Sequence, residues 1–268
     1  EGFAATSLSW IVISIVGAVP FVVTGCIPNP VDALFETVSG FTTTGASILP
    51  AVEGLPNGIL FWRSFTHWIG GMGVLVFLLA IAPVAREGGS MFLLRAEFPG
   101  PMAAKLVPRM QKSAKLLYEI YIVMTLAQII LLLLGGIPLF DCVNISLSTV
   151  STGGFCVRND SMASYGAYAQ NVTLVFMTLC SISFSLFYCA VAREFLRIRR
   201  SRELRTFIIV VLGVALLMGI DTASKIESLG QGVHHTLFQV VSIISTTCYV
   251  SVDASFWSRC VWSMLTVL

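Results

Sequence analysis

A stretch rich in threonine and glycine, Val38–Ser47, occurs three times along the chain in related form. It reads VSGFTTTGAS at this first place, LSTVSTGGF at Leu147–Phe155 and VSIISTTCY at Val241–Tyr249. Each time, a short apolar segment precedes the loop and a long one follows it. Internal repetition of this kind constrains a fold more strongly than any local signal. We therefore expect one unit of helix, short helix, loop and helix, used three times.

The three loops align at four consecutive positions, which we number one to four. The columns are Thr42/Ser151/Ser245, Thr43/Thr152/Thr246, Thr44/Gly153/Thr247 and Gly45/Gly154/Cys248. Non-helical backbone at membrane depth is tolerated only where protein buries it or where it lines a water-filled path. Carbonyl and threonine oxygens on such a path can replace the hydration shell of a cation. Glycine supplies the unusual backbone angles that let consecutive carbonyls face one axis.

The composition is that of a membrane protein. Hydrophobic residues make up 56% of the 268 residues, charged residues only 11%, and the mean hydropathy is +0.87. Soluble domains average roughly 25% charged residues. The first apolar run, Phe3–Thr24, carries no charge and has about the 20 residues that a membrane-spanning helix needs. The expected fold class is an all-α membrane protein of repeated helix, pore helix, filter loop and helix.

The charges indicate the orientation. The segments Arg86–Lys115 and Arg193–Arg205 hold twelve of the sixteen basic residues, and such runs favour the cytoplasmic side. The opposite side would carry eight of the fourteen acidic residues: Asp32, Glu36, Glu53, Asp141, Asp160, Asp221, Glu227 and Asp253. An acidic outer face would gather cations at the mouth. Nucleic acid is not an implied partner, because topology explains the basic runs.

These signals divide the chain into five parts. We expect a first pore repeat over 1–85, a cytoplasmic linker over 86–113, a second pore repeat over 114–192, a basic cytoplasmic linker over 193–205 and an incomplete third repeat over 206–268. Short helices are expected from Asn29 or Asp32 to about Ser39, over Phe140–Val150 and over Gly232–Ile244. Reporter tags at Gly88 and Ser201 should then be cytoplasmic, and a tag at Asn159 external.

Several polar residues outside the loops allow two interpretations. Arg63 and His67 share one helical face, where they either brace a filter loop by hydrogen bonds or anchor the helix at the membrane interface. His234 and His235 are adjacent, so their side chains diverge on a helix and favour a structural role over a metal site. The seven cysteines show no metal-binding spacing and are interpreted mostly as small apolar residues.

The loop TTTGAS, the following FWRSFTHWIGGMG and the repeated STGGF together resemble the Trk/Ktr/HKT superfamily of potassium transporters, especially its TrkH branch. The resemblance covers essentially the whole chain. It implies four helix–pore-loop–helix repeats around a potassium-channel-like pore, with a filter at Thr42–Gly45, Ser151–Gly154 and Ser245–Cys248. It also implies potassium as the transported ion, no covalent cofactor, membrane lipid around the protein, a homodimer, a TrkA-like cytoplasmic nucleotide-binding regulatory subunit and a bacterial inner membrane with multiple passes.

The chain departs from that pattern in two ways. A fourth repeat is absent and the third stops within its last span, as expected of a portion of a longer protein. Cys248 stands where the family has glycine, which puts unaltered ion selectivity in doubt. Cys248 must either adopt the strained conformation or rotate its peptide and withdraw one carbonyl.

Other functions are weaker candidates. A sodium-permeable path, or one coupled to sodium or protons, is the alternative within the same superfamily. An enzyme would need paired carboxylates, a Ser/His pair or a metal cluster, and His67, His234 and His235 have no partners at a suitable spacing. A secondary transporter of organic substrates has broken helices but no reason to repeat a Thr/Gly loop three times.

Overall fold

The computed structural model describes residues 2–73, 110–182, 186–187, 189, 200–222, 229–252 and 257. These residues form helices and connecting loops, without a strand in the described part. The helices are α1 (Gly2–Val23), α2 (Pro30–Phe41), α3 (Asn57–Gly71), α6 (Met110–Leu134), α7 (Leu139–Val150), α8 (Ala167–Cys180), α11 (Arg202–Thr222) and α12 (Leu229–Ile244). The all-helical fold class is therefore confirmed.

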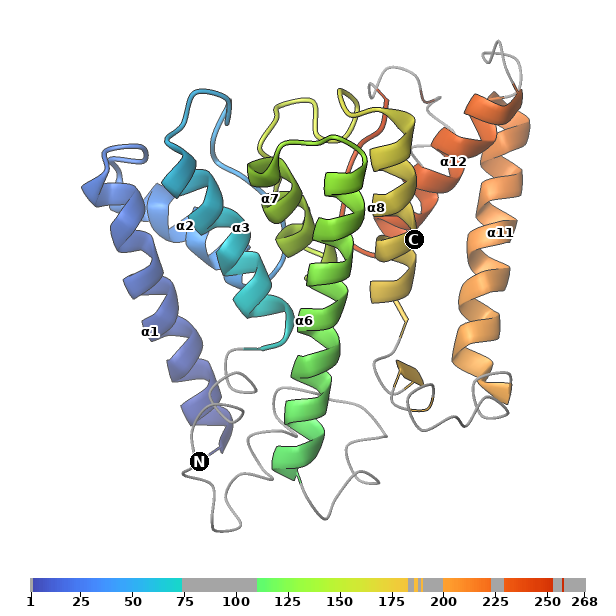
Figure 1. Cartoon of the computed structure of the whole chain (residues 1–268). Coiled ribbons are helices and arrows are strands. Elements are labelled where there is room, and N and C mark those ends of the chain that lie inside the picture. Colours follow the sequence, from blue (N-terminus) through green and yellow to red (C-terminus); the bar gives the residue numbers. More distant parts are fainter. Residues whose placement is uncertain are drawn as a thin grey trace.

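The helices have two lengths. The long helices α1, α6 and α11 run through most of the height of the molecule, whereas α2, α7 and α12 lie in its upper half (Figure 1). Both α2 and α7 have 12 residues, or about 18 Å at 1.5 Å per residue, too short to cross some 30 Å of hydrocarbon. Each short helix therefore ends inside the molecule, and its loop begins there.

The packing repeats along the chain. The short helix α2 packs between α1 and α3, α7 packs between α6 and α8, and α12 packs against α11. Successive repeats also touch, because α3 contacts α7 and α8 contacts α12. The second helix of one repeat is thus the neighbour of the short helix of the next. This arrangement brings the ends of the three short helices together.

The start of α2 agrees with the sequence signal. Asn29 caps the helix, and its side-chain Oδ1 accepts a hydrogen bond of 3.0 Å from the backbone N–H of Val31. Pro30 follows as the first helical residue, where its missing N–H costs nothing. The helix continues to Phe41, past the expected end at Ser39. The loop therefore starts at Thr42, the first of the four aligned positions.

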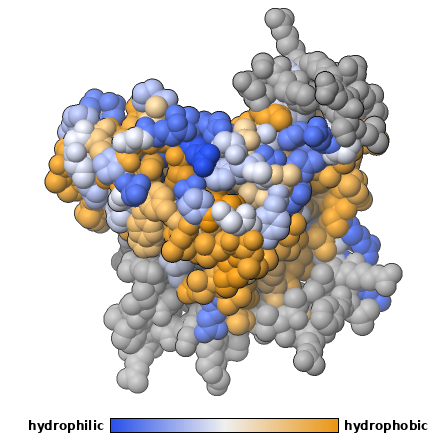
Figure 2. All heavy atoms as spheres, turned by 45° about the horizontal axis from the view of Figure 1, so that its top comes forward, coloured by the Kyte–Doolittle hydropathy of each residue, from blue (hydrophilic) through white to orange (hydrophobic). Residues whose placement is uncertain are grey.

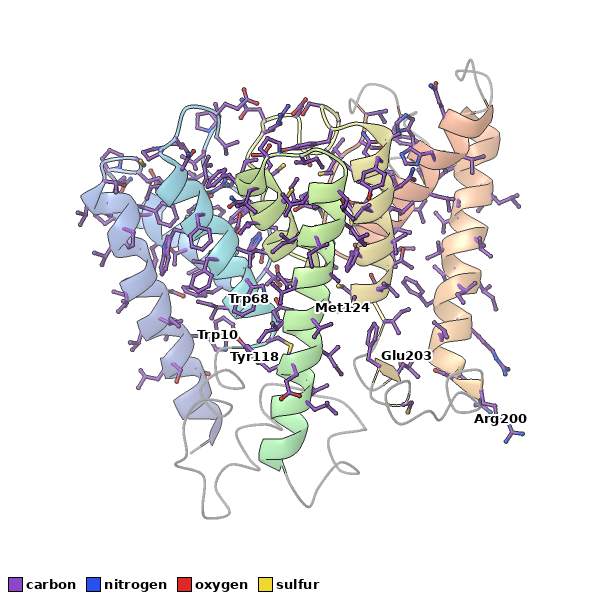
Figure 3. All side chains as sticks on the ribbon, viewed as in Figure 1. Trp10, Trp68, Tyr118, Met124, Arg200 and Glu203 are labelled. Carbon is purple, nitrogen blue, oxygen red and sulfur yellow. The ribbon has the colours of Figure 1, made fainter. Side chains whose placement is uncertain are left out.

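Two aromatic contacts fix α3 against α6. The indole N–H of Trp68 donates to Oγ1 of Thr125 at 3.1 Å, and the hydroxyl of Tyr121 donates to the carbonyl of Trp68 at 2.9 Å. Tyr118 packs edge-on to Trp68, and the two residues lie between the helices in Figure 3. These contacts join the first repeat to the second.

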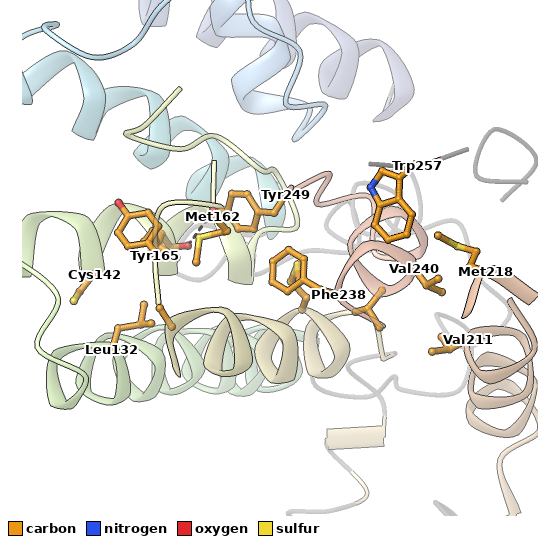
Figure 4. Close-up of a cluster of buried hydrophobic side chains, with 14 residues drawn as sticks. Leu132, Cys142, Met162, Tyr165, Val211, Met218, Phe238, Val240, Tyr249 and Trp257 are labelled. Carbon is orange, nitrogen blue, oxygen red and sulfur yellow. Dashed lines mark hydrogen bonds between the residues drawn. The ribbon is translucent and has the colours of Figure 1, made fainter. Parts of the chain in front are cut away.

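A buried apolar cluster joins the second and third repeats. Its side chains come from α6, α7, α8, α11, α12 and the segments that follow the second and third loops (Figure 4). Phe238, Met177 and Tyr249 are fully buried within it. The third short helix is therefore seated on the second repeat by close packing.

The surface has the character of a membrane protein. Polar residues gather on the upper face, and apolar residues form the surface below it (Figure 2). Within the described ranges, Leu116–Leu134 is the helical segment both long and apolar enough to cross a membrane. Shorter apolar stretches are Ser7–Val23, Leu139–Val150 and Ala167–Cys180. Large side chains on α1, such as Leu8 at 62% and Val16 at 62% exposure, are consistent with contact to lipid.

The orientation remains a prediction that tags can test. The N-terminus and Arg200, just before α11, lie at the lower end of the molecule, and the segment between α7 and α8 reaches its upper face (Figures 1 and 3). A reporter tag at Ser201 should be cytoplasmic and a tag at Asn159 external. Protection of both tags on the same side would contradict the topology. Gly88 and most of both basic linkers lie outside the described residues.

Candidate functional site

The three short helices end in the same kind of turn. After α2, the N–H of Thr43 donates to the carbonyl of Gly40 and the N–H of Thr44 to that of Ser39, each at 3.0 Å. After α7, Thr152 and Gly153 donate in the same way to Thr149 and Ser148. This pair of bonds is a Schellman motif, which satisfies carbonyls that the helix end leaves open. After α12, the first of these two bonds is present, because the N–H of Thr246 donates to the carbonyl of Ile243.

The motif places threonine where glycine is usual. Thr43, Thr152 and Thr246, all at position two, have φ of 53°, 56° and 61°. Such left-handed angles cost a residue other than glycine roughly 1–2 kcal/mol, and a β-branched residue there is an outlier. Strained backbone that recurs at equivalent places is characteristic of functional sites. Sequence reasoning missed this feature, because it assigned the special conformation to the glycine column alone.

The sign of φ alternates along each loop. The expected positive φ at position four is confirmed, at 76° for Gly45 and 82° for Gly154. Position one is right-handed, with φ of −82° at Thr42 and −81° at Ser151, and position three has no positive φ. Alternating right- and left-handed residues turn successive peptides the same way, so N–H groups line one edge. Carbonyl oxygens on the opposite edge would suit a path for a dehydrated cation.

The loops touch one another in a repeated relation. A Cβ atom added to Gly45 would overlap the carbonyl oxygen of Gly153 in the second loop. A Cβ atom added to Gly154 would overlap the carbonyl oxygen of Thr247 in the third loop. In both cases position four of one loop abuts position three of the next. The three loops therefore stand side by side in one register.

The hydroxyls at position one act mainly as helix caps. Thr42 donates through Oγ1 to the carbonyl of Val38, and Ser151 through Oγ to that of Leu147, each at 2.7 Å. In the third loop, Ser245 donates to the carbonyl of Ser242 at 3.1 Å. These bonds satisfy carbonyl oxygens that lack a backbone donor at the helix end. The hydroxyls at position one are therefore already paired with the helix ends.

Cys248 keeps the conformation of the glycines that it replaces. Its φ is 57°, compared with 76° and 82° at Gly45 and Gly154. Of the two outcomes expected from the sequence, strain rather than a rotated peptide is therefore observed. Its N–H donates to the carbonyl of Ser242 at 2.9 Å, whereas the equivalent N–H of Gly154 reaches Ser148 only at 3.5 Å. The thiol is exposed.

A buried ion pair lies behind the first loop. Nε of Arg63 is 2.7 Å from Oε1 of Glu36, and both side chains are almost completely buried. The same carboxylate accepts the hydroxyl of Ser47 and, at 2.9 Å, the backbone N–H of Ile48. A buried ion pair is stable only when further hydrogen bonds satisfy its remaining atoms, and this one has them. The pair therefore fixes the segment that leaves the first loop.

Arg63 and His67 also hold the second loop. The guanidinium of Arg63 lies 4.1 Å from the centroid of the Phe155 ring, and the His67 ring is stacked on Phe155 with centroids 3.9 Å apart. Nδ1 of His67 accepts the backbone N–H of Phe155 at 3.4 Å. Interfacial anchoring, one of the two readings of these residues, is wrong, because Arg63 and His67 are buried at 2% and 0% exposure. Bracing of the second loop, through contacts with Phe155, is the arrangement observed.

The remaining candidate residues have structural partners. A ring nitrogen of His234 lies 3.0 Å from Oε1 of Gln170, and one of His235 lies 3.1 Å from Oγ of Ser251. These contacts join the start of α12 to α8 and to the segment after the third loop. The cysteines that the structure describes are free thiols, with Cys142 and Cys189 buried. No grouping of three metal-binding side chains occurs among the described residues.

The fold and the loops together define an all-helical membrane protein built from repeated units of helix, short helix, loop and helix. The family profile named TrkH, described as a cation transport protein, matches residues 1–268, and the chain belongs to this family.

Known relatives agree with this assignment. The chain is 35% identical over 263 residues to the Trk system potassium uptake protein TrkH of Halomonas elongata, and 33% identical over 266 residues to TrkG of Escherichia coli. Each match covers 96% of this chain and 54% of the relative. The crystal structure of the potassium transporter TrkH from Vibrio parahaemolyticus superimposes with a TM-score of 0.83 at 30% identity, over 100% of this chain and 55% of that one. The chain thus spans about half the length of these relatives.

Proposed function

We propose that this chain forms three sectors of a potassium-selective path for potassium uptake across a bacterial inner membrane, which the protein crosses several times. The proposed filter consists of positions one to four of the three loops: Thr42, Thr43, Thr44, Gly45, Ser151, Thr152, Gly153, Gly154, Ser245, Thr246, Thr247 and Cys248. Potassium is the transported ion, and no cofactor takes part. The names of the relatives support the choice of ion.

One observation carries this proposal. Position four of one loop contacts position three of the next at both junctions, Gly45 with Gly153 and Gly154 with Thr247. Together with the alternating φ, this packing supports an arrangement in which carbonyl oxygens from different loops face one axis. The three short helices end at the same place, and the partial negative charge of a helix C-terminus stabilises a cation. A potassium ion that leaves its water would find several such oxygens at once.

Growth provides the first test. The native protein, expressed in a bacterial strain that lacks its own potassium uptake systems, should restore growth at low potassium. Uptake should be measured directly with potassium against sodium as competing ions. We expect the protein to restore growth and to take up potassium while rejecting sodium. Equal uptake of sodium would favour the sodium-permeable alternative instead.

The proposed partners follow from the family. A homodimer in a lipid bilayer, with a TrkA-like nucleotide-binding subunit on the cytoplasmic side, is the assembly that we propose. The lower face of the molecule is the expected docking side for this subunit, since Arg200, Arg202 and Arg205 of the second basic linker lie at the start of α11. Co-purification of the regulatory subunit with the native protein, and its loss when these arginines are replaced by glutamine, would test this docking.

Cys248 is the specific reason to consider sodium permeation. Because the backbone of Cys248 is left-handed, the third loop is strained at position four, where the first two loops have glycine. We expect Cys248→Gly in the native protein to raise the potassium-to-sodium permeability ratio. Potassium or thallium ions should also protect the exposed thiol of the unchanged protein from a small thiol reagent. An unchanged ratio together with no protection would show that Cys248 lies outside the ion path.

A further inference from the structure

The residue after position four, which we call position five, differs in kind among the loops. It is Ala46 in the first loop, Phe155 in the second and Tyr249 in the third. Phe155 and Tyr249 are buried at 2% and 0% exposure, whereas Ala46 is exposed. The two aromatic side chains therefore leave the filter edge and enter the protein behind it. Both reach the repeat that precedes their own.

Phe155 is held by the first repeat. Its ring lies against the Arg63 guanidinium and is stacked on His67, which also accepts the Phe155 N–H. The His67 ring fills the space beside Gly153 as well, because a Cβ atom on Gly153 would overlap it. His67 therefore backs positions three and five of the second loop. Arg63 is fixed in turn by Glu36, so the ion pair behind the first loop also sets the place of the second.

Tyr249 is held by the second repeat. The one hydrogen of its hydroxyl is shared between the carbonyl of Phe155, at 3.3 Å, and the carbonyl of Ile145, in α7, at 3.4 Å. The Tyr249 carbonyl accepts the hydroxyl of Ser242 at 2.7 Å. Further out, the N–H of Met162 donates to the carbonyl of Val250 at 3.0 Å. The third loop is thus tied to the second by one phenolic oxygen close to the filter and by backbone pairing above it.

These contacts follow the order of the repeats along the chain. They lead from Glu36 and Arg63 through Phe155 to Tyr249, one repeat at a time. The glycine contacts run along the same loops, but on the side that faces the neighbouring carbonyls. Each junction is therefore packed at position four and anchored at position five. A loop held at both places cannot move toward its neighbour without breaking a buried contact.

We propose that Phe155 and Tyr249 are positioning residues that fix the distance between adjacent filter loops and thereby limit passage of the smaller sodium ion. The inference rests on the proposed function of the loops. Sodium needs oxygens closer together than potassium does, so a ring that cannot contract leaves it poorly coordinated. The hydroxyl of Tyr249 links the third loop to the carbonyls of Phe155 and Ile145 behind the second loop. Its removal should let the third loop move while the path itself stays open.

The test compares two tyrosines whose hydroxyls both donate to backbone carbonyl oxygens. Tyr249→Phe in the native protein should lower the potassium-to-sodium permeability ratio by a factor of roughly two to ten, as for loss of one hydrogen bond. Potassium uptake and the melting temperature should change little. The matched control is Tyr168→Phe, because Tyr168 donates to the carbonyl of Leu131 at 2.9 Å on the exposed side of α8. The control should have the same potassium-to-sodium permeability ratio as the unchanged protein.

A second pair of variants covers the case in which Tyr249→Phe does not assemble. His67→Asn keeps an acceptor near the position of Nδ1, whereas His67→Leu keeps bulk and has none. The asparagine variant should retain more of the selectivity than the leucine variant. A role in packing alone would predict equal selectivity for the two.

The outcomes separate this inference from the proposed function. Unchanged selectivity in Tyr249→Phe, or equal selectivity in the two His67 variants, overturns the positioning role if Gly154→Ser still destroys selectivity. If Gly154→Ser is also without effect, the filter itself has been misplaced, and both the function and the inference fail.

Discussion

Gly154→Ser should lower the potassium-to-sodium permeability ratio by at least about tenfold, with Gly45→Ser acting in the same direction. Two effects combine at Gly154. Its φ of 82° costs a residue with a side chain roughly 1–2 kcal/mol, which already corresponds to about a tenfold change in an equilibrium. The new Cβ atom would also overlap the Thr247 carbonyl oxygen, so that this oxygen must leave its place in the ring. The ratio should be measured by competition between the two ions in the native protein.

Gly136→Ser is the matched control. Gly136 has a similar φ of 77°, but a Cβ atom added there would meet nothing within 4 Å. The control carries the same backbone strain outside the loops and should leave selectivity unchanged. A Gly154→Ser protein that is as selective as the control would show that the second loop does not line the path.

Loss of the Arg63 charge should have the second large effect. Arg63→Met would leave the Glu36 carboxylate buried without its cation, which costs about 3–5 kcal/mol in folding free energy. Glu36 is 1% exposed, so water cannot replace the lost partner. We expect a clear fall in the melting temperature of the purified protein and loss of most potassium uptake. Because Arg63 also packs on Phe155, the protein that remains folded should have reduced selectivity.

A more exposed ion pair among the described residues supplies the comparison. Arg158 lies 3.8 Å from Asp141, and its side chain is 40% exposed. Exposed pairs contribute about 0–1 kcal/mol, so Arg158→Met should change the melting temperature little. The double variant Glu36→Gln and Arg63→Met should recover part of the lost stability, because no buried charge is left unpaired. A single Arg63→Met variant as stable as Arg158→Met would contradict the account of the buried pair.

The arrangement of the loops could be predicted from the sequence because it is repeated. Alignment of three short segments is enough to find the column of Gly45, Gly154 and Cys248 and to expect its positive φ. The cap at Asn29 followed from a local rule. These features depend on residues that are neighbours in the chain. Their energies are local, and local patterns report them.

The contacts behind the filter could not be predicted in the same way. Glu36 and Arg63 are separated by 27 residues, and Phe155 by 88 from His67. Such contacts depend on how the helices pack, which no short window reveals. A signal was nevertheless present, because a charged residue within an apolar helix needs a partner. Pairing Arg63 with the one acidic residue in the apolar part of α2, Glu36, would have found the brace.

The left-handed threonines show a different limit. Propensity argues against a positive φ at Thr43, Thr152 and Thr246, since threonine is β-branched. The Schellman bonds at the helix ends and the contacts between loops outweigh that preference. The tertiary structure therefore determines the conformation at position two, against the local tendency of the residue. Repetition of threonine at this position was the only available hint.

The location of bound ions tests the central claim most directly. Crystals of the native protein, grown with rubidium or thallium in place of potassium, should be examined by anomalous diffraction. We predict anomalous peaks on the axis between the three loops, at the level of the carbonyls of positions two to four. These peaks should weaken in Gly154→Ser. Peaks away from the loops, with none on this axis, would contradict the assignment of the three loops to one ion path.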